Sequence, residues 1–442
     1  MTPAERAAAA TADVWQAVDS GVRATVVNSP PGTGKSALVR EISRRVAVRA
    51  QVPVVVQTNE QADDMVRGFL RDMDDGGGTG LVVGRLHRNG YTPPADIAAD
   101  RRAAISNDIR QLRRCGVIVA PAARWAFVRD LTWPFAIVDE AYQMRSDLLM
   151  PIADLNRRLL LVGDPGQLSP FTAADDTVLR GMPLSPLDDA AGTVLTTRPD
   201  APQIALPVSW RLPPSAATVI SDAFYETPFE AGVPDGVRSL RLPLAAVTTA
   251  EEAALRTAAA GGWALLSLPD LLMPQSDPGA VASLAAVVAT ALDSRAVAQD
   301  EHGERPLAAS DIAVGVTHRN QRAQVAAAVH AVCAERGLPA GSVVVDTANR
   351  LQGRQYELVV AWHPLSSRRD ASAFHLEAGR LCVLLSRHRQ ACIVVSRGGL
   401  REQLEAHPST DPVWLSEQLP VVDGWSAHLA LLDHLQQHSV PA

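Results

Sequence analysis

Lysine is nearly absent from this sequence. Of its 41 lysine and arginine residues only one, Lys35, is a lysine, so arginine carries almost all of the positive charge. An ammonium is a compact charge on a flexible stem, whereas a guanidinium is wide and planar and favours a fork of acceptors. The one position that keeps a lysine is therefore the first candidate for a functional site.

A basic excess, long apolar runs and cysteine pairs are also missing. The formal net charge is −7, which excludes a chain that binds nucleic acid through an overall positive surface, although arginines can still gather on one face. No apolar run is long enough to span a bilayer and the N-terminus lacks a signal-peptide pattern, so we expect a cytoplasmic protein with no membrane partner. The four cysteines form no CxxC pair, and we expect buried, reduced thiols.

The 442 residues favour more than one domain. Short Val/Ile/Leu runs alternate with helical patterns, first in ATVVN, VPVVVQ, LVVG, GVIVA, FAIVDE and RLLLVG, and later in GWALLSL, DIAVGV, SVVVD, ELVVAW and CIVVS. Such alternation predicts parallel sheets covered on both faces. A Pro/Asp/Thr-rich region near residues 172–207 separates the two series. We therefore predict two α/β domains, residues 1–195 and 196–442.

Three further segments carry local expectations. Residues 96–114, DIAADRRAAISNDIRQLRR, are expected to form a helix, and the polar stretches 72–80 and 293–306 are expected to be mobile loops.

A strand, a glycine-rich loop and a helix follow one another around Lys35. ATVVN, SPPGTG and KSALVREISRRVAV give the context of a phosphate-binding P-loop, and the GKS end of the loop matches GxxxxGK[ST], although Ser29 stands at the place of the first glycine. Backbone N–H groups of such a loop hold phosphate oxygens. Lys35 is predicted to reach the β- and γ-phosphates, and Ser36 to bind Mg²⁺. The candidate nucleotide-binding residues are Gly32, Thr33, Gly34, Lys35 and Ser36.

Two adjacent carboxylates end the apolar run in FAIVDEAYQM, residues 135–144. Asp139 is predicted to hold Mg²⁺ through water, and Glu140 to orient and deprotonate the attacking water. A surface Asp-Glu pair is common, so the assignment depends on the P-loop that precedes it.

Taken in order, these motifs resemble those of superfamily-one helicases. VDEAYQ and LVGDPGQLSP resemble motifs II and III, VVVQTNEQADDMV resembles motif Ia, and LPVSWRLPP resembles the start of the second motor domain. DIAVGVTHRNQRAQV, VDTANRLQGRQYELVV and EAGRLCVLLSRHRQACIVV resemble motifs IV, V and VI, so that the resemblance covers about residues 10–400. The glutamine at position 143, within the stretch that resembles motif II, resembles the pattern of one branch of this family, that of the nonsense-decay RNA helicase and its bacterial relatives. The resemblance implies two RecA-like parallel-sheet P-loop NTPase domains with an ATP site in the cleft between them.

The resemblance also implies roles for single residues. Gln167 would sense the γ-phosphate, and Arg211 and Arg387 would act as arginine fingers, a role that suits the donor fork of a guanidinium. Trp210 would stack on the base of the nucleotide, and Gln16 would read adenine. Surface ion pairs are the alternative for the two arginines, and a core position is the alternative for Trp210.

The nucleic-acid contacts and one departure come from the remaining motifs. Gln355 replaces the glutamate usual in motif V; its amide can bond a ribose hydroxyl but carries no charge. The resemblance places backbone contacts to nucleic acid at Thr58, Asn59 and Thr347, and we add Arg319, Asn320 and Gln321 as candidates. For each of these residues a helix cap or a turn is the alternative.

The resemblance implies an ATP-dependent single-strand translocase or helicase with ATP and Mg²⁺ as cofactors and DNA or RNA as partner. Short spacers between the motifs leave no room for the large insertion of the 3′-to-5′ branch, which favours a 5′-to-3′ polarity and a nearly bare motor. We hypothesise that such a motor needs a protein partner for loading. A nucleic-acid-binding ATP switch or clamp without unwinding activity is the alternative, and a P-loop ATPase with no nucleic-acid role is a third.

Overall fold

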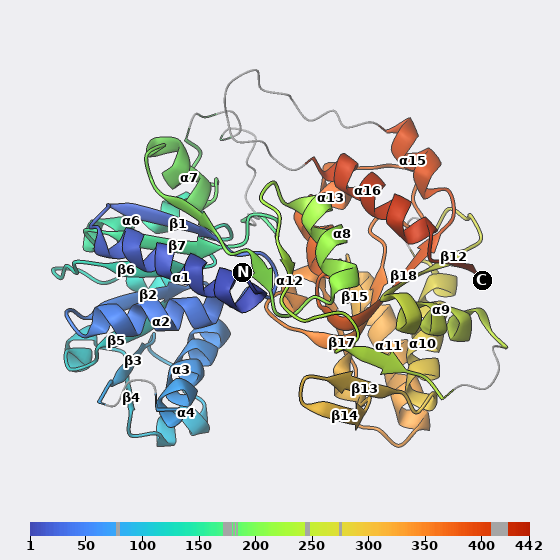
Figure 1. Ribbon diagram of the computed structural model, residues 1–442, viewed down its shortest axis with the longest axis horizontal. Coiled ribbons are helices and arrows are strands. Elements are labelled where there is room, and N and C mark those ends of the chain that lie inside the picture. The colour runs from blue at the N-terminus through green and yellow to red at the C-terminus, as the bar shows by residue number, and fades with distance from the viewer. Residues whose placement is uncertain are drawn as a thin grey trace. The chain divides into compact units, whose positions relative to one another are not determined.

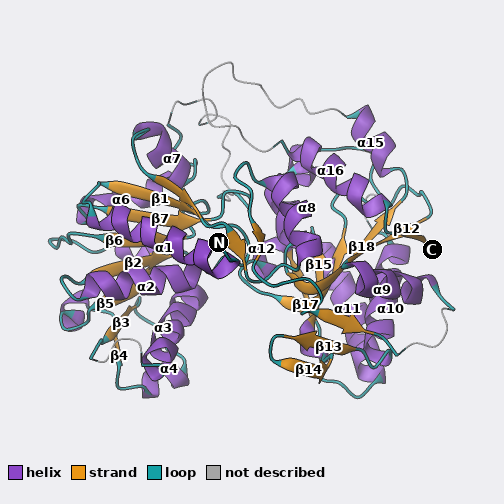
Figure 2. Cartoon of the chain, viewed as in Figure 1, coloured by secondary structure: helices purple, strands orange, loops and turns teal. Residues whose placement is uncertain are grey.

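The computed structural model describes residues 1–76, 80–170, 179, 182, 184–243, 248–273, 276–407 and 423–442. The chain forms two compact units (Figure 1), one of Met1–Pro165 with Ser169–Pro207 and the other of Gly166–Leu168 with Val208–Ala442. In each unit helices cover both faces of a sheet (Figure 2). The predicted fold class, two α/β domains built on parallel sheets, is confirmed.

The first unit is built on an eight-stranded sheet of order β4-β3-β5-β2-β6-β7-β1-β8, in which all neighbours are parallel. The strands are β1 (Ala24–Asn28), β2 (Val52–Val56), β3 (Val83–Leu86), β4 (Ala103–Ser106), β5 (Val117–Pro121), β6 (Ala136–Asp139), β7 (Leu159–Gly163) and β8 (Gln203–Ala205). The helices are α1 (Pro3–Asp19), α2 (Lys35–Ala47), α3 (Asn59–Asp74), α4 (Ala95–Ala99), α5 (Ala122–Trp125), α6 (Ser146–Leu155) and α7 (Ala190–Thr197), with a 3-10 helix at Ile109–Leu112.

Two hydrophobic cores lie on the two faces of this sheet. Because successive strand side chains point to opposite faces, Val27 packs with α1, α2 and α3, whereas its neighbour Val26 packs with α5, α6 and α7. Val54 and Val55 of β2 divide in the same way, and every residue of β2 is buried. The continuous apolar runs thus arise because both faces of the sheet are covered.

The second unit has a six-stranded sheet of order β16-β15-β17-β18-β12-β19, again with all neighbours parallel. Its strands are β12 (Trp263–Leu268), β15 (Ile312–Val316), β16 (Val344–Thr347), β17 (Tyr356–Trp362), β18 (His388–Arg397) and β19 (Ser439–Pro441). The helices are α8 (Pro214–Phe224), α9 (Ala250–Gly261), α10 (Pro278–Asp293), α11 (Arg319–Glu335), α12 (Ala348–Leu351), α13 (Ala373–Leu376), α14 (Ala378–Leu385), α15 (Leu400–Ala406) and α16 (Gly424–Gln436), with a 3-10 helix at Ala309–Asp311.

Two small sheets accompany the large one. β9 (Val208–Ser209) pairs with β10 (Glu230–Ala231), and β11 (Ser239–Arg241) pairs with the antiparallel hairpin of β13 (Val297–Asp300) and β14 (Gly303–Pro306). The prediction that residues 293–306 form a mobile loop is therefore wrong for most of this segment. The sequence 297–306 reads as a loop because it is polar, and it is ordered here by pairing with β11 rather than by a core of its own.

The predicted domain boundary between residues 195 and 196 differs from the division seen in the structure. It falls inside α7, which packs against α6, β1 and β7 of the first unit, and β8 then adds the last strand of that sheet. The chain divides after Pro207 instead. Of the separating region 172–207, residues 172–178, 180, 181 and 183 lie outside the described part of the chain, as do residues 77–79 of the predicted loop 72–80.

The predicted helix at 96–114 is also wrong. The segment forms α4, then β4, then the 3-10 helix at Ile109–Leu112. β4 pairs in register with the edge strand β3, from Val83 with Ala103 to Leu86 with Ser106. Strand pairing therefore overrides the local helical pattern, as tertiary contacts often do.

The cysteine expectation is confirmed, since all four thiols are free and buried. Within the described ranges, no helix combines the length and the apolar character needed to cross a membrane.

Candidate active site

The P-loop connects β1 to α2 at the carboxyl edge of the first sheet. Gly32 and Gly34 have φ angles of 78° and 87°, a left-handed backbone that glycine adopts without strain, and Gly34 occupies the N-cap of α2. The first N–H groups of a helix have no partner within the helix, so the start of α2 offers donors to an anion. Lys35 and Ser36 are the first two residues of this helix, and Ser36 is exposed.

Ser29 fits the loop at the place of the usual glycine. Its φ is not positive, so no glycine is required there. The buried Ser29 hydroxyl lies 2.7 Å from Oγ1 of Thr33, which itself donates to the carbonyl of Pro30 at 2.9 Å. The Ser29 amide donates to the Gly163 carbonyl at 2.7 Å. The serine hydroxyl thus adds a hydrogen bond within the loop, while the backbone amide, which a glycine would also have, holds the loop to β7.

Lys35 and the two carboxylates converge at this edge. The Lys35 ammonium forms an ion pair with Glu140 and lies 3.8 Å from Oδ1 of Asp139. Burial alone would lower the pKa of Lys35, but the negative charges of Glu140, Asp139 and Asp164 outweigh it and raise that pKa above its ordinary value. Burial raises the pKa of Asp139 to about 6, against the attraction of Lys35 and with a further contribution from the charge of Glu140.

Glu140 adopts a backbone conformation that is rare for its residue type. Its φ is 56°, in the left-handed region, where a side chain with a Cβ is strained. The carboxylate is nevertheless well held, because Oε2 accepts from Nε2 of Gln143 at 2.7 Å while Lys35 binds the other oxygen. Such strain persists where the surroundings fix it, and it is frequent at functional sites.

The oxygen atoms present suit a magnesium ion. Asp139 and Ser36 offer hard oxygen ligands, and Mg²⁺ commonly takes one or two protein ligands together with substrate phosphates and water. Within the described part of the chain, no group of three or more His, Cys, Asp and Glu side chains could hold a metal ion. A Mg²⁺ site completed by phosphate oxygens needs only one or two protein ligands, so it does not require a group of three such side chains.

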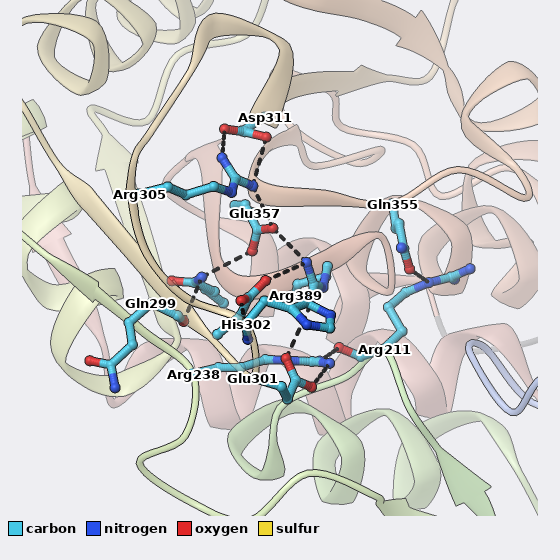
Figure 3. Close-up of polar contacts among 12 residues, drawn as sticks. Arg211, Arg238, Gln299, Glu301, His302, Arg305, Asp311, Gln355, Glu357 and Arg389 are labelled. Carbon is cyan, nitrogen blue, oxygen red and sulfur yellow. Dashed lines mark hydrogen bonds and ion pairs between the residues drawn. The ribbon is translucent and has the colours of Figure 1, made fainter.

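In the second unit Arg211, Gln355 and Arg387 lie together. Nε of Arg211 donates to Oε1 of Gln355 at 3.4 Å (Figure 3), and its Nη1 donates to the Ser386 carbonyl at 3.4 Å. Arg387 is buried, and its Nη2 donates to the Ser386 hydroxyl at 2.8 Å. Gln355 immediately precedes β17 and Arg387 immediately precedes β18, so both lie at the amino edge of the second sheet. Because Arg387 is buried, the surface ion pair is wrong for this residue.

Trp210 remains on the surface. Its side chain is 40% exposed, so the alternative of a core position is wrong. Gly232 allows the close approach of the indole to the chain next to β10, since a Cβ at Gly232 would lie 2.5 Å from Cε3 of Trp210. One part of the indole is therefore covered and the rest stays available for stacking.

The structure adds two residues that the sequence reasoning missed, Arg238 and Glu301. Arg238 donates through Nη1 to the Arg211 carbonyl at 2.6 Å and through Nη2 to the Trp210 carbonyl at 2.9 Å. Its guanidinium also pairs with Glu301 at the turn of the β13–β14 hairpin, and Arg389 donates to Glu301 at 3.3 Å (Figure 3). Arg238 therefore fixes the backbone that carries Arg211 and Trp210. No sequence motif signals this contact, because Glu301 lies far along the chain in a segment that reads as a loop.

Gln167 belongs to the second unit, although the residues on either side of Gly166–Leu168 belong to the first. Leu168 is buried in the hydrophobic core that contains Leu212 and Leu381. Nε2 of Gln352 donates to Oε1 of Gln167 at 2.7 Å. Gln352 lies in the stretch that resembles motif V, so the structure joins the motif III glutamine to motif V.

The predicted nucleic-acid contacts all lie at or just after the carboxyl ends of strands. Thr58 caps α3 by accepting from the Gln61 amide at 3.2 Å, and Oδ1 of Asn59 accepts from Arg85 at 2.9 Å, so both side chains have structural partners. Thr347 ends β16 and is almost buried, whereas Arg319 begins α11 and is exposed. Thr58 and Asn59 lie at the carboxyl edge of the first sheet, and Thr347 and Arg319 lie at that of the second.

Gln16 does not join the P-loop. It is exposed near the end of α1, two residues before Val18, whose carbonyl accepts from Nη1 of Arg158 at 3.2 Å. Arg158 directly precedes β7, so this end of α1 lies at the amino edge of the sheet, opposite the P-loop. The assignment of Gln16 to adenine is wrong for this reason.

No family model matches the sequence, and no curated protein matches it. Among solved structures, the arterivirus nonstructural protein 10 helicase is similar at 14% identity and a TM-score of 0.45, over 88% of this chain and 63% of that one. The PRRSV helicase is similar at 15% identity and 0.42, over 94% and 64%, and the helicase MrfA bound to DNA at 12% and 0.45, over 88% and 46%. The chain spans less than two thirds of the length of each. No inference about activity follows from similarity at this level.

Proposed function

We propose that this chain is an ATP hydrolase driven by single-stranded nucleic acid, acting as a translocase or helicase of 5′-to-3′ polarity. The observation that carries the proposal is the meeting of Lys35 with Asp139 and Glu140 at the carboxyl edge of a parallel sheet, where the P-loop and the start of α2 also offer backbone donors. A lone ammonium beside two carboxylates and an anion cradle suits nucleoside triphosphate chemistry.

Each group has a defined task in this proposal. Lys35 exchanges its Glu140 partner for phosphate oxygens, which leaves the Glu140 carboxylate to accept a proton from the attacking water. Gln143 keeps that carboxylate oriented during the exchange. Asp139 and Ser36 hold Mg²⁺, which neutralises phosphate charge when bound.

The second unit would supply the remaining groups. Arg211 and Arg387 contribute positive charge where phosphate charge spreads in the transition state. Trp210 offers a stacking surface to the base, and Gln355 an amide to the ribose. Gln167, bonded to Gln352, couples motif III to motif V. Thr58, Asn59, Thr347 and Arg319 line the track of the strand at the two carboxyl edges, and a protein partner assists loading.

Opening of tailed duplexes tests this proposal. A duplex with a 5′ single-stranded tail should be opened in the presence of ATP and Mg²⁺, and one with only a 3′ tail should not. Preferential opening of the 3′-tailed duplex would reverse the polarity. ATP turnover that rises with single strands but opens neither duplex would favour the alternative, a nucleic-acid-binding ATP switch or clamp.

A further inference from the structure

Tyr142 lies beside the two carboxylates of the candidate active site but has no task in the proposed hydrolysis. It belongs to the turn after β6, two residues beyond Glu140. Its hydroxyl donates to Oδ1 of Asn28 at 2.6 Å. Asn28 is the last residue of β1 and directly precedes the P-loop. This hydrogen bond therefore joins the turn that carries Glu140 to the strand that leads into the P-loop.

The bond crosses the end of a third strand. Because β7 lies between β6 and β1, the Tyr142 side chain has to cover two strand spacings, about 10 Å, to reach Asn28. Gly163, the last residue of β7, leaves this path open, since a Cβ there would lie 3.0 Å from Cδ2 of Tyr142. Gly163 is also the register partner of Asn28, and its carbonyl accepts from the Ser29 amide. Tyr142 thus links the carboxyl ends of three adjacent strands.

The surroundings of Tyr142 keep its hydroxyl a donor. The ring packs against the hydrophobic core that contains Val26 and Met144. Burial raises the pKa of Tyr142 above its ordinary value, and the negative charges of Asp189 and Asp164 raise it further. The hydroxyl therefore stays protonated throughout the neutral range and can hold the Asn28 amide oxygen there.

Glu140 needs a support of this kind when a nucleotide binds. Its φ of 56° is strained, and such strain persists where the surroundings fix it. Lys35 holds one carboxylate oxygen and Gln143 the other. In the proposed hydrolysis Lys35 leaves for phosphate oxygens, so the turn loses this contact at the step in which Glu140 accepts a proton. The bond from Tyr142 to Asn28 does not involve Lys35 and is kept.

We propose that Tyr142 is a positioning residue, whose hydrogen bond to Asn28 keeps the Glu140 carboxylate aligned with the P-loop after Lys35 has turned to the phosphates. This inference rests on the proposed ATP hydrolysis and adds to it a residue that touches neither the nucleotide nor Mg²⁺. Misplacing a reacting group by about 1 Å can slow a reaction about 100-fold. Loss of the bond should therefore slow the chemical step, whereas ATP affinity depends on the P-loop amides and Lys35.

Tyr142→Phe tests the proposal, because it keeps the ring over Gly163 and removes the hydroxyl. Hydrolysis is measured in single turnovers at saturating ATP and Mg²⁺, without any polymer and well below the midpoint of unfolding. The rate should fall about tenfold, while the dissociation constant of a fluorescent ATP analogue should change by less than about threefold. A merely structural role would lower the midpoint of unfolding and leave the rate of the folded enzyme unchanged.

Asn28→Leu is an independent second variant, since it removes the acceptor and keeps a side chain of similar shape. It should slow hydrolysis by a factor close to that of Tyr142→Phe. The double variant should be no slower than either single variant, because both changes remove the same link. Two unrelated losses would multiply instead.

Trp133→Phe is the matched control. The buried Trp133 indole N–H donates to Oε1 of Gln51 at 2.8 Å, so this variant also removes a bond from an aromatic side chain to an amide oxygen in the first unit. Trp133 precedes β6 and Gln51 precedes β2, so the bond lies at the amino edge, away from the P-loop. The variant should lower the midpoint of unfolding and leave the single-turnover rate unchanged.

Single-turnover rates of Tyr142→Phe and Asn28→Leu within twofold of the wild type would overturn the assignment. A loss confined to ATP affinity, or an equal loss of rate in Trp133→Phe, would also overturn it, since the bond would then shape the P-loop or stabilise the unit as a whole. Failure of the proposed function looks different. The wild type would then hydrolyse ATP at a basal rate that no strand changes, and the variants would still be compared on that basal rate.

Discussion

At the scale of single residues, the lysine that remains in an arginine-rich chain lies between a helix N-terminus and two carboxylates. Lys35→Arg keeps the charge but introduces a wider, planar group that cannot enter between phosphates. We expect ATP turnover to fall by at least about 100-fold, as for loss of a preorganised electrostatic contact. Steady-state turnover of wild type and variant measures this, with unfolding midpoints as the control for folding. Near-normal turnover would remove this explanation of the single lysine.

Glu140 offers a second test at the same site. Glu140→Gln keeps the shape of the side chain but removes the basic oxygen, so the variant should bind ATP and Mg²⁺ and hydrolyse ATP slowly. A fluorescent ATP analogue reports binding, and single-turnover hydrolysis reports chemistry. Loss of nucleotide binding itself would show that the roles of Asp139 and Glu140 are exchanged.

The pKa of Asp139 predicts a pH dependence of stability. Burial raises that pKa to about 6 from an ordinary value of 3.8, so between these values the unfolded chain has released a proton that the folded chain keeps. The difference in free energy of unfolding between the wild type and the Asp139→Asn variant should therefore fall by about 2–3 kcal/mol as pH rises from about 4 to about 6. Above that range the difference should stay level. Denaturant unfolding of both proteins across this range measures the difference. A difference that stays constant would show that the carboxyl titrates normally.

At the scale of elements, the β13–β14 hairpin positions the segment that carries Trp210 and Arg211. Arg238 joins the two by bonding both carbonyls and Glu301. Arg238→Gln should lower kcat several-fold and raise the KM for ATP, because Arg211 and Trp210 lose their fixed backbone. Arg238→Lys should restore part of the loss, since an ammonium can still reach one carbonyl. ATP turnover as a function of ATP concentration separates the two effects.

Arg241 is the matched control for Arg238. It belongs to β11 and pairs with Glu304 of the same hairpin, but both side chains are more than half exposed. An exposed pair contributes little, so Arg241→Gln should leave kcat and KM unchanged. Equal effects of the two variants would mean that Arg238 acts through hairpin stability alone.

The same elements show why part of the fold could be predicted from the sequence. Runs such as VPVVVQ are buried on both faces, so their composition alone marks them as strands. β4 and β13 have no such pattern, because each is an edge or hairpin strand whose order comes from pairing with a distant strand. Local residues cannot report a partner that lies elsewhere in the chain.

At the scale of the whole molecule, the parts of the candidate site that lie in one stretch of sequence could be predicted, and those that depend on distant residues could not. The P-loop and the DE pair could be predicted because each is a contiguous stretch at the end of a strand. Gln16 was misplaced because sequence proximity to the P-loop does not tell which edge of the sheet a helix end reaches. Arg238 and Glu301 could not be predicted, because the two residues come from separate loops.

The chain also passes between its two units more than once. Gly166–Leu168 is part of the second unit although its neighbours belong to the first, and Gln167 is bonded there to Gln352. Under the proposed function, this short segment is the part of the chain through which a bound strand would affect ATP hydrolysis.

ATP turnover with single-stranded DNA, with single-stranded RNA and without polymer is the measurement that tests the central claim most directly. We predict that turnover rises strongly with at least one of the two strands, and that this rise weakens as salt increases, because binding to phosphates releases counterions. Lys35→Arg should show no rise. Turnover by the wild type that is the same with and without either polymer would contradict the proposal that single strands drive ATP hydrolysis.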